Sequence, residues 1–121
     1  MSTTRPLEPT AYLKVARELA GKDGEEYLRT AIGRLYYCCF LIARQRTGVT
    51  ATKDVHRIVI TTVRGRAGYW GVADQLDNLR RLRVAADYQL VPTDPRRRDW
   101  HRNWARAESI ANTILPQLQA L

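Results

Sequence analysis

Apolar residues recur every three to four positions along almost the whole chain, and no stretch alternates apolar with polar residues as a half-buried strand would. The pattern therefore predicts helices throughout. The first is expected at 9–20, with Pro9 at its start and Gly21 beyond its end. The second is expected at about 25–47, where acidic residues favour the N-terminus and Gly48 ends the helix.

The same period continues in the second half of the chain. A third helix is expected to begin at Thr52 or Asp54 and to be broken by the glycine-rich segment 65–71, which is predicted to be a loop. A fourth helix follows at about 72–90, with leucines on its buried side.

The fifth helix is expected to begin at Pro95, with Asp94 as its N-cap, and to continue to the C-terminus. Pro116 is expected to kink or shorten its last turns. The connections are short, so successive helices should run antiparallel. We therefore predict an all-α, up-and-down bundle of four to five helices that forms a single domain, 1–121, with a flexible N-terminus at 1–8.

The charge of the chain is strongly positive. Lysine and arginine together number 20 against 12 acidic residues, which gives a formal net charge of +8, and only three of the basic residues are lysines. Arginine presents a planar set of donors that suits phosphate, and it stacks on bases. The balance therefore favours a nucleic-acid partner, although a genome rich in arginine codons would produce the same composition.

Several classes of protein are excluded. No apolar run has the length of a membrane span, and the first ten residues lack the apolar core of a secretory signal. The adjacent Cys38 and Cys39 cannot form an ordinary disulfide with each other and indicate buried thiols in a reducing cytoplasm. The two histidines, His56 and His101, are distant from them in sequence, so we expect neither a metal site nor a cofactor.

Three segments carry a family resemblance. Residues 33–40 read GRLYYCCF, residues 54–59 read DVHRIV, and residues 79–88 read LRRLRVAADY. In this order and spacing they resemble the HEPN superfamily of small helical domains that bind or cleave RNA. The third segment is similar to the Leu-Arg-x-x-Ala-Asp-Tyr form found in one branch of small stand-alone HEPN proteins.

The resemblance implies a helical bundle that forms a homodimer, with two copies of an Arg-x(4–6)-His motif in a basic cleft between the subunits. Active members of the family are metal-independent endoribonucleases, in which the histidine moves the 2′-hydroxyl proton and the arginine offsets charge on the phosphate. Many members are encoded beside a nucleotidyltransferase in toxin–antitoxin or phage-defence systems. Such a nucleotidyltransferase, or a larger defence complex, is therefore a partner to consider.

The chain departs from that motif at its expected site. Arg83 occupies the position of the family arginine, but Asp87 and Tyr88 stand where the histidine should be. Asp87 could accept a proton, yet its carboxyl would be a poor acid unless its pKa were strongly raised. Arg83 and Asp87 could equally form a simple ion pair four residues apart, and Tyr88 could cap the core. Together with Arg80, on the same stripe, Arg83 and Tyr88 are candidate RNA contacts.

A second candidate motif lies downstream. Arg96 and His101 have four residues between them, which satisfies the bare Arg-x4-His spacing. With Arg97 and Arg98 they are expected to open a helix whose N-terminal amides favour anions, and Trp100 would add a stacking surface. The alternative is a basic surface turn over a tryptophan of the core. For phosphate contact we favour the first interpretation, and for catalysis the second.

Two further residues are candidate RNA contacts. Arg34, within a mostly buried helix, needs a partner such as Asp87 or a nucleotide phosphate. His56 is a lone histidine on an amphipathic helix, and such residues are more often structural. Tyr36 and Tyr37 cannot both face inward, because neighbouring side chains on a helix diverge by about 100°. One of them should therefore meet solvent, a dimer partner or RNA.

Three functions remain open. The first is a HEPN-like protein that binds RNA or nucleotide without the usual Arg-x-His catalysis, and the missing histidine favours it. The second is a metal-independent endoribonuclease that uses Arg83 with Asp87, or Arg96 with His101. The third is a structural helical adaptor whose positive charge is incidental.

Overall fold

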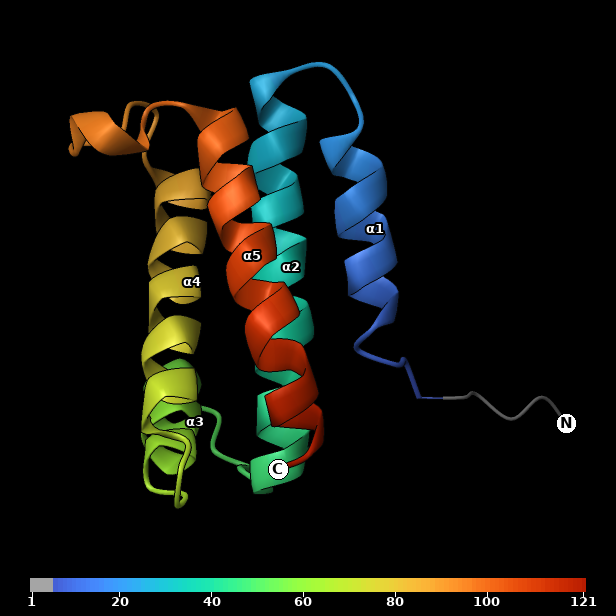
Figure 1. The fold of residues 1–121 in the computed structure, drawn as a ribbon, viewed down its shortest axis with the longest axis vertical. Helices are drawn as coiled ribbons and strands as arrows, with labels where there is room; N and C mark the ends of the chain where they lie inside the picture. Colours follow the sequence, from blue (N-terminus) through green and yellow to red (C-terminus); the bar gives the residue numbers. More distant parts are fainter. Residues whose placement is uncertain (1–5) are drawn as a thin grey trace, which may run out of the picture.

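The computed structural model describes residues 6–121 as five α-helices and one short 3-10 helix, with no strand in that range (Figure 1). The predicted all-α bundle is therefore confirmed. Of the expected flexible N-terminus, residues 1–5 lie outside the described residues, and 6–8 have no regular secondary structure. None of the helices in the described part has the length and apolar character needed to span a membrane. In chain order the elements are α1 (Ala11–Ala20), α2 (Glu25–Thr47), α3 (Val55–Arg64), α4 (Trp70–Tyr88), η1 (Pro95–Arg97) and α5 (Trp100–Gln119).

Helix α2 is the centre of the bundle, because α1, α3, α4 and α5 all pack against it. In Figure 1, α1 lies alongside α2 on the side opposite α4, α5 crosses in front of α2, and α3 lies behind the lower part of α4. Helix α2 is consequently apolar around most of its circumference, as expected for a helix surrounded by neighbours. It contributes Tyr36, the largest fully buried side chain.

The predicted burial of both cysteines is confirmed, since Cys38 and Cys39 are free thiols in the core. Burial raises the pKa of the Cys38 thiol to about 11, and it raises the pKa of the Cys39 thiol still further.

The predicted helix boundaries hold for α2 and for α3, which follows Asp54 and ends before Gly65, and they differ in part for the other helices. Helix α1 begins at Ala11, after Pro9, and α4 begins at Trp70, inside the segment predicted to be a loop, and ends at Tyr88. Pro116 lies within α5, which continues to Gln119.

The prediction of one continuous helix from Pro95 is wrong. Asp94 caps only the short helix η1, where its side chain accepts from the Arg96 amide at 3.0 Å. Asp99 then caps α5, accepting from the Arg102 amide at 3.1 Å. Two capping aspartates therefore start two separate elements, and α5 proper begins at Trp100.

Candidate nucleic-acid interface

Arg83 lies on the side of α4 that faces α2, and its side chain is only 16% exposed. One terminal nitrogen, Nη2, donates to the Tyr37 hydroxyl of α2 at 3.2 Å. The guanidinium carbon lies 5.3 Å from the Tyr37 ring centroid and 5.6 Å from that of Tyr88. Two aromatic rings, from different helices, therefore fix the guanidinium in place.

The predicted ion pair between Arg83 and Asp87 is present, with Nε 2.8 Å from Oδ2. The contact lacks hydrogen-bond geometry, and the buried Arg83 Nε has no hydrogen-bond partner in the described part of the chain. This Nε is shielded from solvent beside the Asp87 carboxylate, so a ligand in front of the pair could reach only the terminal nitrogens of the guanidinium.

A hollow of about 340 Å³ opens in front of this pair between α2 and α4. We call it the Arg83 hollow; it is lined by Thr30, Gly33, Arg34, Tyr37, Arg83 and Asp87. Arg34 is exposed, and its guanidinium carbon lies 5.8 Å from the ring centroid of Tyr12 on α1. The predicted partner Asp87 thus shares a hollow with Arg34, although within residues 6–121 no ion pair joins Arg34 to a carboxylate. Two guanidiniums and one carboxylate leave this hollow positive.

The paired tyrosines diverge as predicted. Tyr36 is buried in the core, where its hydroxyl oxygen lies 2.7 Å from Nδ1 of His56, and Tyr37 is half-buried at the Arg83 hollow. The His56 ring stacks on Phe40, with ring centroids 4.2 Å apart. Burial, together with the charges of neighbouring arginines, Arg83 first among them, holds the pKa of His56 below its ordinary value of 6.5. His56 is therefore a neutral imidazole at pH 7.

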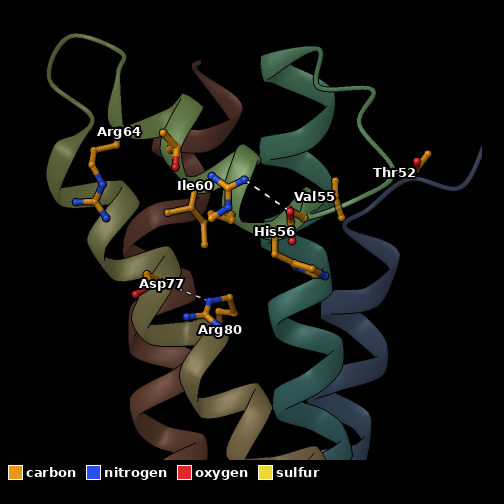
Figure 2. A pocket seen from close by; sticks show the side chains of 10 residues that line it. Thr52, Val55, His56, Ile60, Arg64, Asp77 and Arg80 are labelled. Carbon is orange, nitrogen blue, oxygen red and sulfur yellow. Dashed lines mark hydrogen bonds and ion pairs between the residues drawn. The ribbon is translucent and has the colours of Figure 1, made fainter.

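A second hollow, of about 720 Å³, lies between α3 and α4. Figure 2 shows His56 on α3 and Arg80 on α4, with the Arg80 guanidinium turned toward Asp77 and Arg64 farther away. We call it the His56 hollow; its lining includes Thr52, His56, Ile60, Arg64, Asp77 and Arg80. Asp77 accepts from Arg80 at 2.9 Å and also pairs with Arg81 at 3.2 Å.

The downstream candidate motif does not form a comparable site. Arg96 is exposed and bound to Asp94, Arg98 donates to the Pro92 carbonyl at 3.0 Å, and His101 is exposed on the first turn of α5. The expected anion-binding helix N-terminus is already occupied by the Asp99 carboxylate.

The prediction that Trp100 offers a stacking surface is also wrong, because its side chain is 4% exposed and belongs to the core. The guanidinium carbon of Arg29 covers the ring, 4.2 Å from its centroid. Arg97 borders a separate hollow between α4 and α5 with Arg81 and Arg106, away from the aromatic cluster. The structure therefore brings together Arg34, Arg80, Arg83, Asp87, Tyr88 and His56 around α2 and α4, and it leaves Arg96, Arg97, Arg98 and His101 outside this group.

Gly33 and Thr30 of the Arg83 hollow were not predicted from the sequence, which also left open whether Tyr36 or Tyr37 would face outward. A signal was present, because Thr30, Gly33, Arg34 and Tyr37 fall at positions i, i+3, i+4 and i+7 and so share one face of α2. Among residues 6–121 no group of three or more histidines, cysteines or acids could hold a metal ion. No family model, no curated protein and no solved structure matches the chain.

Proposed function

We propose that this protein is a HEPN-like domain that binds RNA through the phosphates of its backbone, using the Arg83 hollow as the principal contact. The observation that supports this most directly is Arg83 itself. Its guanidinium is held against Tyr37 and Tyr88 and borders a hollow that also contains Arg34.

The chemistry of the hollow suits a phosphate better than a neutral ligand. A guanidinium binds phosphate through directed, charge-assisted hydrogen bonds, and one fixed by stacking loses little side-chain entropy on binding. Tyr88 is 71% exposed beside Arg83, so its ring offers a surface on which a base can stack. A phosphate in the hollow and a base on Tyr88 together describe a single-stranded nucleic acid.

Binding without cleavage through the family motif is the form we favour. Asp87, at the position of the missing histidine, pairs with Arg83, and His101 lies outside the group that surrounds the hollow. One observation favours the ribonuclease alternative: His56 reaches the neighbourhood of Arg83 from α3, and the charge of Arg83 lowers its pKa. A neutral imidazole near a phosphate is the starting requirement for proton transfer.

We further propose that the protein acts as a homodimer, within a toxin–antitoxin or phage-defence system that includes a nucleotidyltransferase or a larger complex. Exposed apolar side chains just beyond the end of α4 support a protein contact near the Arg83 hollow. Leu90 and Val91 are 92% and 67% exposed, and clustered exposed apolar residues are typical of interaction surfaces.

The test is binding of fluorescein-labelled single-stranded RNA, followed by anisotropy at several salt concentrations without added metal. We expect Arg83→Ala to weaken binding by on the order of tenfold and to reduce the salt slope by about one. Arg46→Ala is the matched control, because it removes one charge from an exposed position of α2 that lines neither hollow. Equal effects of the two substitutions would mean that the arginines act only through net charge, and the proposal would be abandoned.

The same RNA, incubated with the wild type, Arg83→Ala, His101→Ala and His56→Ala, separates binding from cleavage. Retained binding with intact RNA supports the binding protein. Cleavage that is lost in His56→Ala supports the ribonuclease, and cleavage lost only in His101→Ala would contradict the assignment of the site. If the wild type neither binds nor cleaves, the protein is an adaptor.

A further inference from the structure

The hydrogen bond between Tyr36 and His56 determines which ring nitrogen carries the proton. Tyr36 is fully buried, and within residues 6–121 its hydroxyl has His56 Nδ1, at 2.7 Å, as its one hydrogen-bond partner. A buried hydroxyl satisfies its proton by donating it, and burial raises the pKa of this phenol far above neutrality. The Tyr36 hydroxyl therefore donates to Nδ1, and the single proton of the neutral imidazole is on Nε2.

The surroundings of His56 keep the ring neutral. The charged groups that act on it from the packed helices are Arg80 and Arg83 of α4 and Arg44 of α2, and all three disfavour the imidazolium. On its own side, Asp54 and Arg57 both line the hollow and form an exposed pair with each other at 3.7 Å. Asp77, the remaining acid of the hollow, is engaged by Arg80 and Arg81.

The contacts of the ring leave Nε2 as the nitrogen that a ligand could use. Nδ1 faces the buried Tyr36 hydroxyl, and one face of the ring is covered by Phe40. His56 also lines the His56 hollow, and Nε2 is the ring nitrogen that the contact with Tyr36 does not engage. Figure 2 shows Arg80 on α4 with its guanidinium turned toward Asp77, and both residues line the same hollow.

We propose that His56 and Arg80 form a second phosphate position next to the Arg83 hollow, in which His56 supplies a fixed N–H donor from Nε2. Arg80 and Arg83 are one helical turn apart on α4, so the two positions would hold neighbouring phosphates of one strand. This inference rests on the proposed function. It also assigns His56 to binding rather than to proton abstraction, because a nitrogen that already carries a proton cannot act as a base.

The first test is the tautomer itself, read from the imidazole ¹⁵N resonances of the wild-type protein at pH 7. The chain has two histidines, and the variant His101→Gln assigns their signals. We expect His56 to be protonated at Nε2 and not at Nδ1, and single-stranded RNA to shift the Nε2 resonance. A proton on Nδ1, or an Nε2 resonance that saturating RNA leaves unchanged, would overturn the inference.

The second test compares substitutions at position 56 by RNA anisotropy. His56→Gln places an amide N–H near the position of Nε2 and should bind RNA nearly as well as the wild type. His56→Ala should lose on the order of tenfold, the value of one hydrogen bond to a charged group. Affinity of the wild type should not fall between pH 6.5 and 8, since no proton has to be gained.

The outcomes distinguish this inference from the function on which it rests. If Arg83→Ala weakens RNA binding but both substitutions of His56 leave it unchanged, the Arg83 hollow stands and the second phosphate position is wrong. If Arg83→Ala has no effect, the proposed function fails first. His101→Gln, at an exposed position outside both hollows, should bind like the wild type, and thermal melting of each variant confirms that it is folded.

Discussion

Gly33→Ala is expected to make the protein more stable and a weaker RNA binder at the same time. Gly33 is buried in the middle of α2 and lines the Arg83 hollow. A Cβ at this position would meet a single neighbouring atom, Oδ1 of Asp87, at 3.6 Å, which is an ordinary van der Waals distance. No packing requirement therefore explains a glycine here.

The gain in stability follows from the helix. Glycine in a helix interior is less favourable than alanine by roughly 0.5–1 kcal/mol, because it loses more backbone freedom on folding. For a chain of 121 residues that gain corresponds to a rise in melting temperature of roughly 2–5 °C.

The loss of binding follows from the hollow. A methyl group on its floor would keep a phosphate from one of its charge-assisted hydrogen bonds to Arg83, and such a bond contributes about 1.5–3 kcal/mol. Affinity should therefore fall by on the order of tenfold.

Thermal melting by circular dichroism and RNA anisotropy on the same preparations test both halves of this prediction. Gly71→Ala is the matched control, because Gly71 is also in a helix, α4, with no atom within 4 Å of an added Cβ, and it lines a different hollow against α5. It should raise the melting temperature slightly, as a residue of the first turn, and leave RNA affinity unchanged. A more stable Gly33→Ala protein with unaltered affinity would refute the assignment of the Arg83 hollow, and a less stable one would refute the geometry at Gly33.

Three further predictions concern stability and reactivity. Arg29 donates to the Gln89 and Leu90 carbonyls at the end of α4, at 2.5 and 2.7 Å. Arg29→Ala should therefore lower the free energy of unfolding in urea by about 2–3 kcal/mol, and unchanged stability would contradict this. Burial raises the pKa of both cysteine thiols, so Cys38 and Cys39 should resist iodoacetamide at pH 8 in the folded protein and react once urea unfolds it. Mass spectrometry follows the labelling, and rapid labelling of the native protein would contradict this prediction. The pKa of His56 is lowered on folding, so the unfolded chain binds a proton at this residue before the folded protein does as the pH falls below 6.5. The free energy of unfolding in urea should therefore decline from pH 7 to 5 more for the wild type than for His56→Gln. Equal declines in the two proteins would contradict the lowered pKa.

The fold was largely predictable from local signals. Helix α2 has the expected bounds because two acids begin it and Gly48, with a φ of 71°, ends it in the left-handed conformation that glycine tolerates. The start of α5 was not, because Asp94 followed by Pro95 has the same local signature as a true helix start. Burial of Trp100 accompanies the later start, and the capping pattern alone does not contain that tertiary contact.

The candidate site was predictable only where its residues are close in sequence. The Arg83–Asp87 pair follows from their spacing of four on a helix. The contact between Arg83 and Tyr37 joins positions 46 apart, and it exists because α2 and α4 pack in one particular register. The Tyr36–His56 hydrogen bond, 20 residues apart, likewise depends on how α3 is placed against α2.

Some arginines of this chain stabilise the fold and others are candidates for binding, and the composition alone cannot distinguish the two groups. Arg29 is 14% exposed, inserts between the carbonyls that end α4 and stacks over Trp100, and a lysine has neither the planar fork nor the flat face for both contacts. Such a residue adds to the net charge of +8 without being available to a phosphate. Arg83 is nearly as enclosed, yet it borders a hollow. What marks a candidate binding arginine in this protein is therefore a fixed guanidinium beside an open space, and not its contribution to the charge.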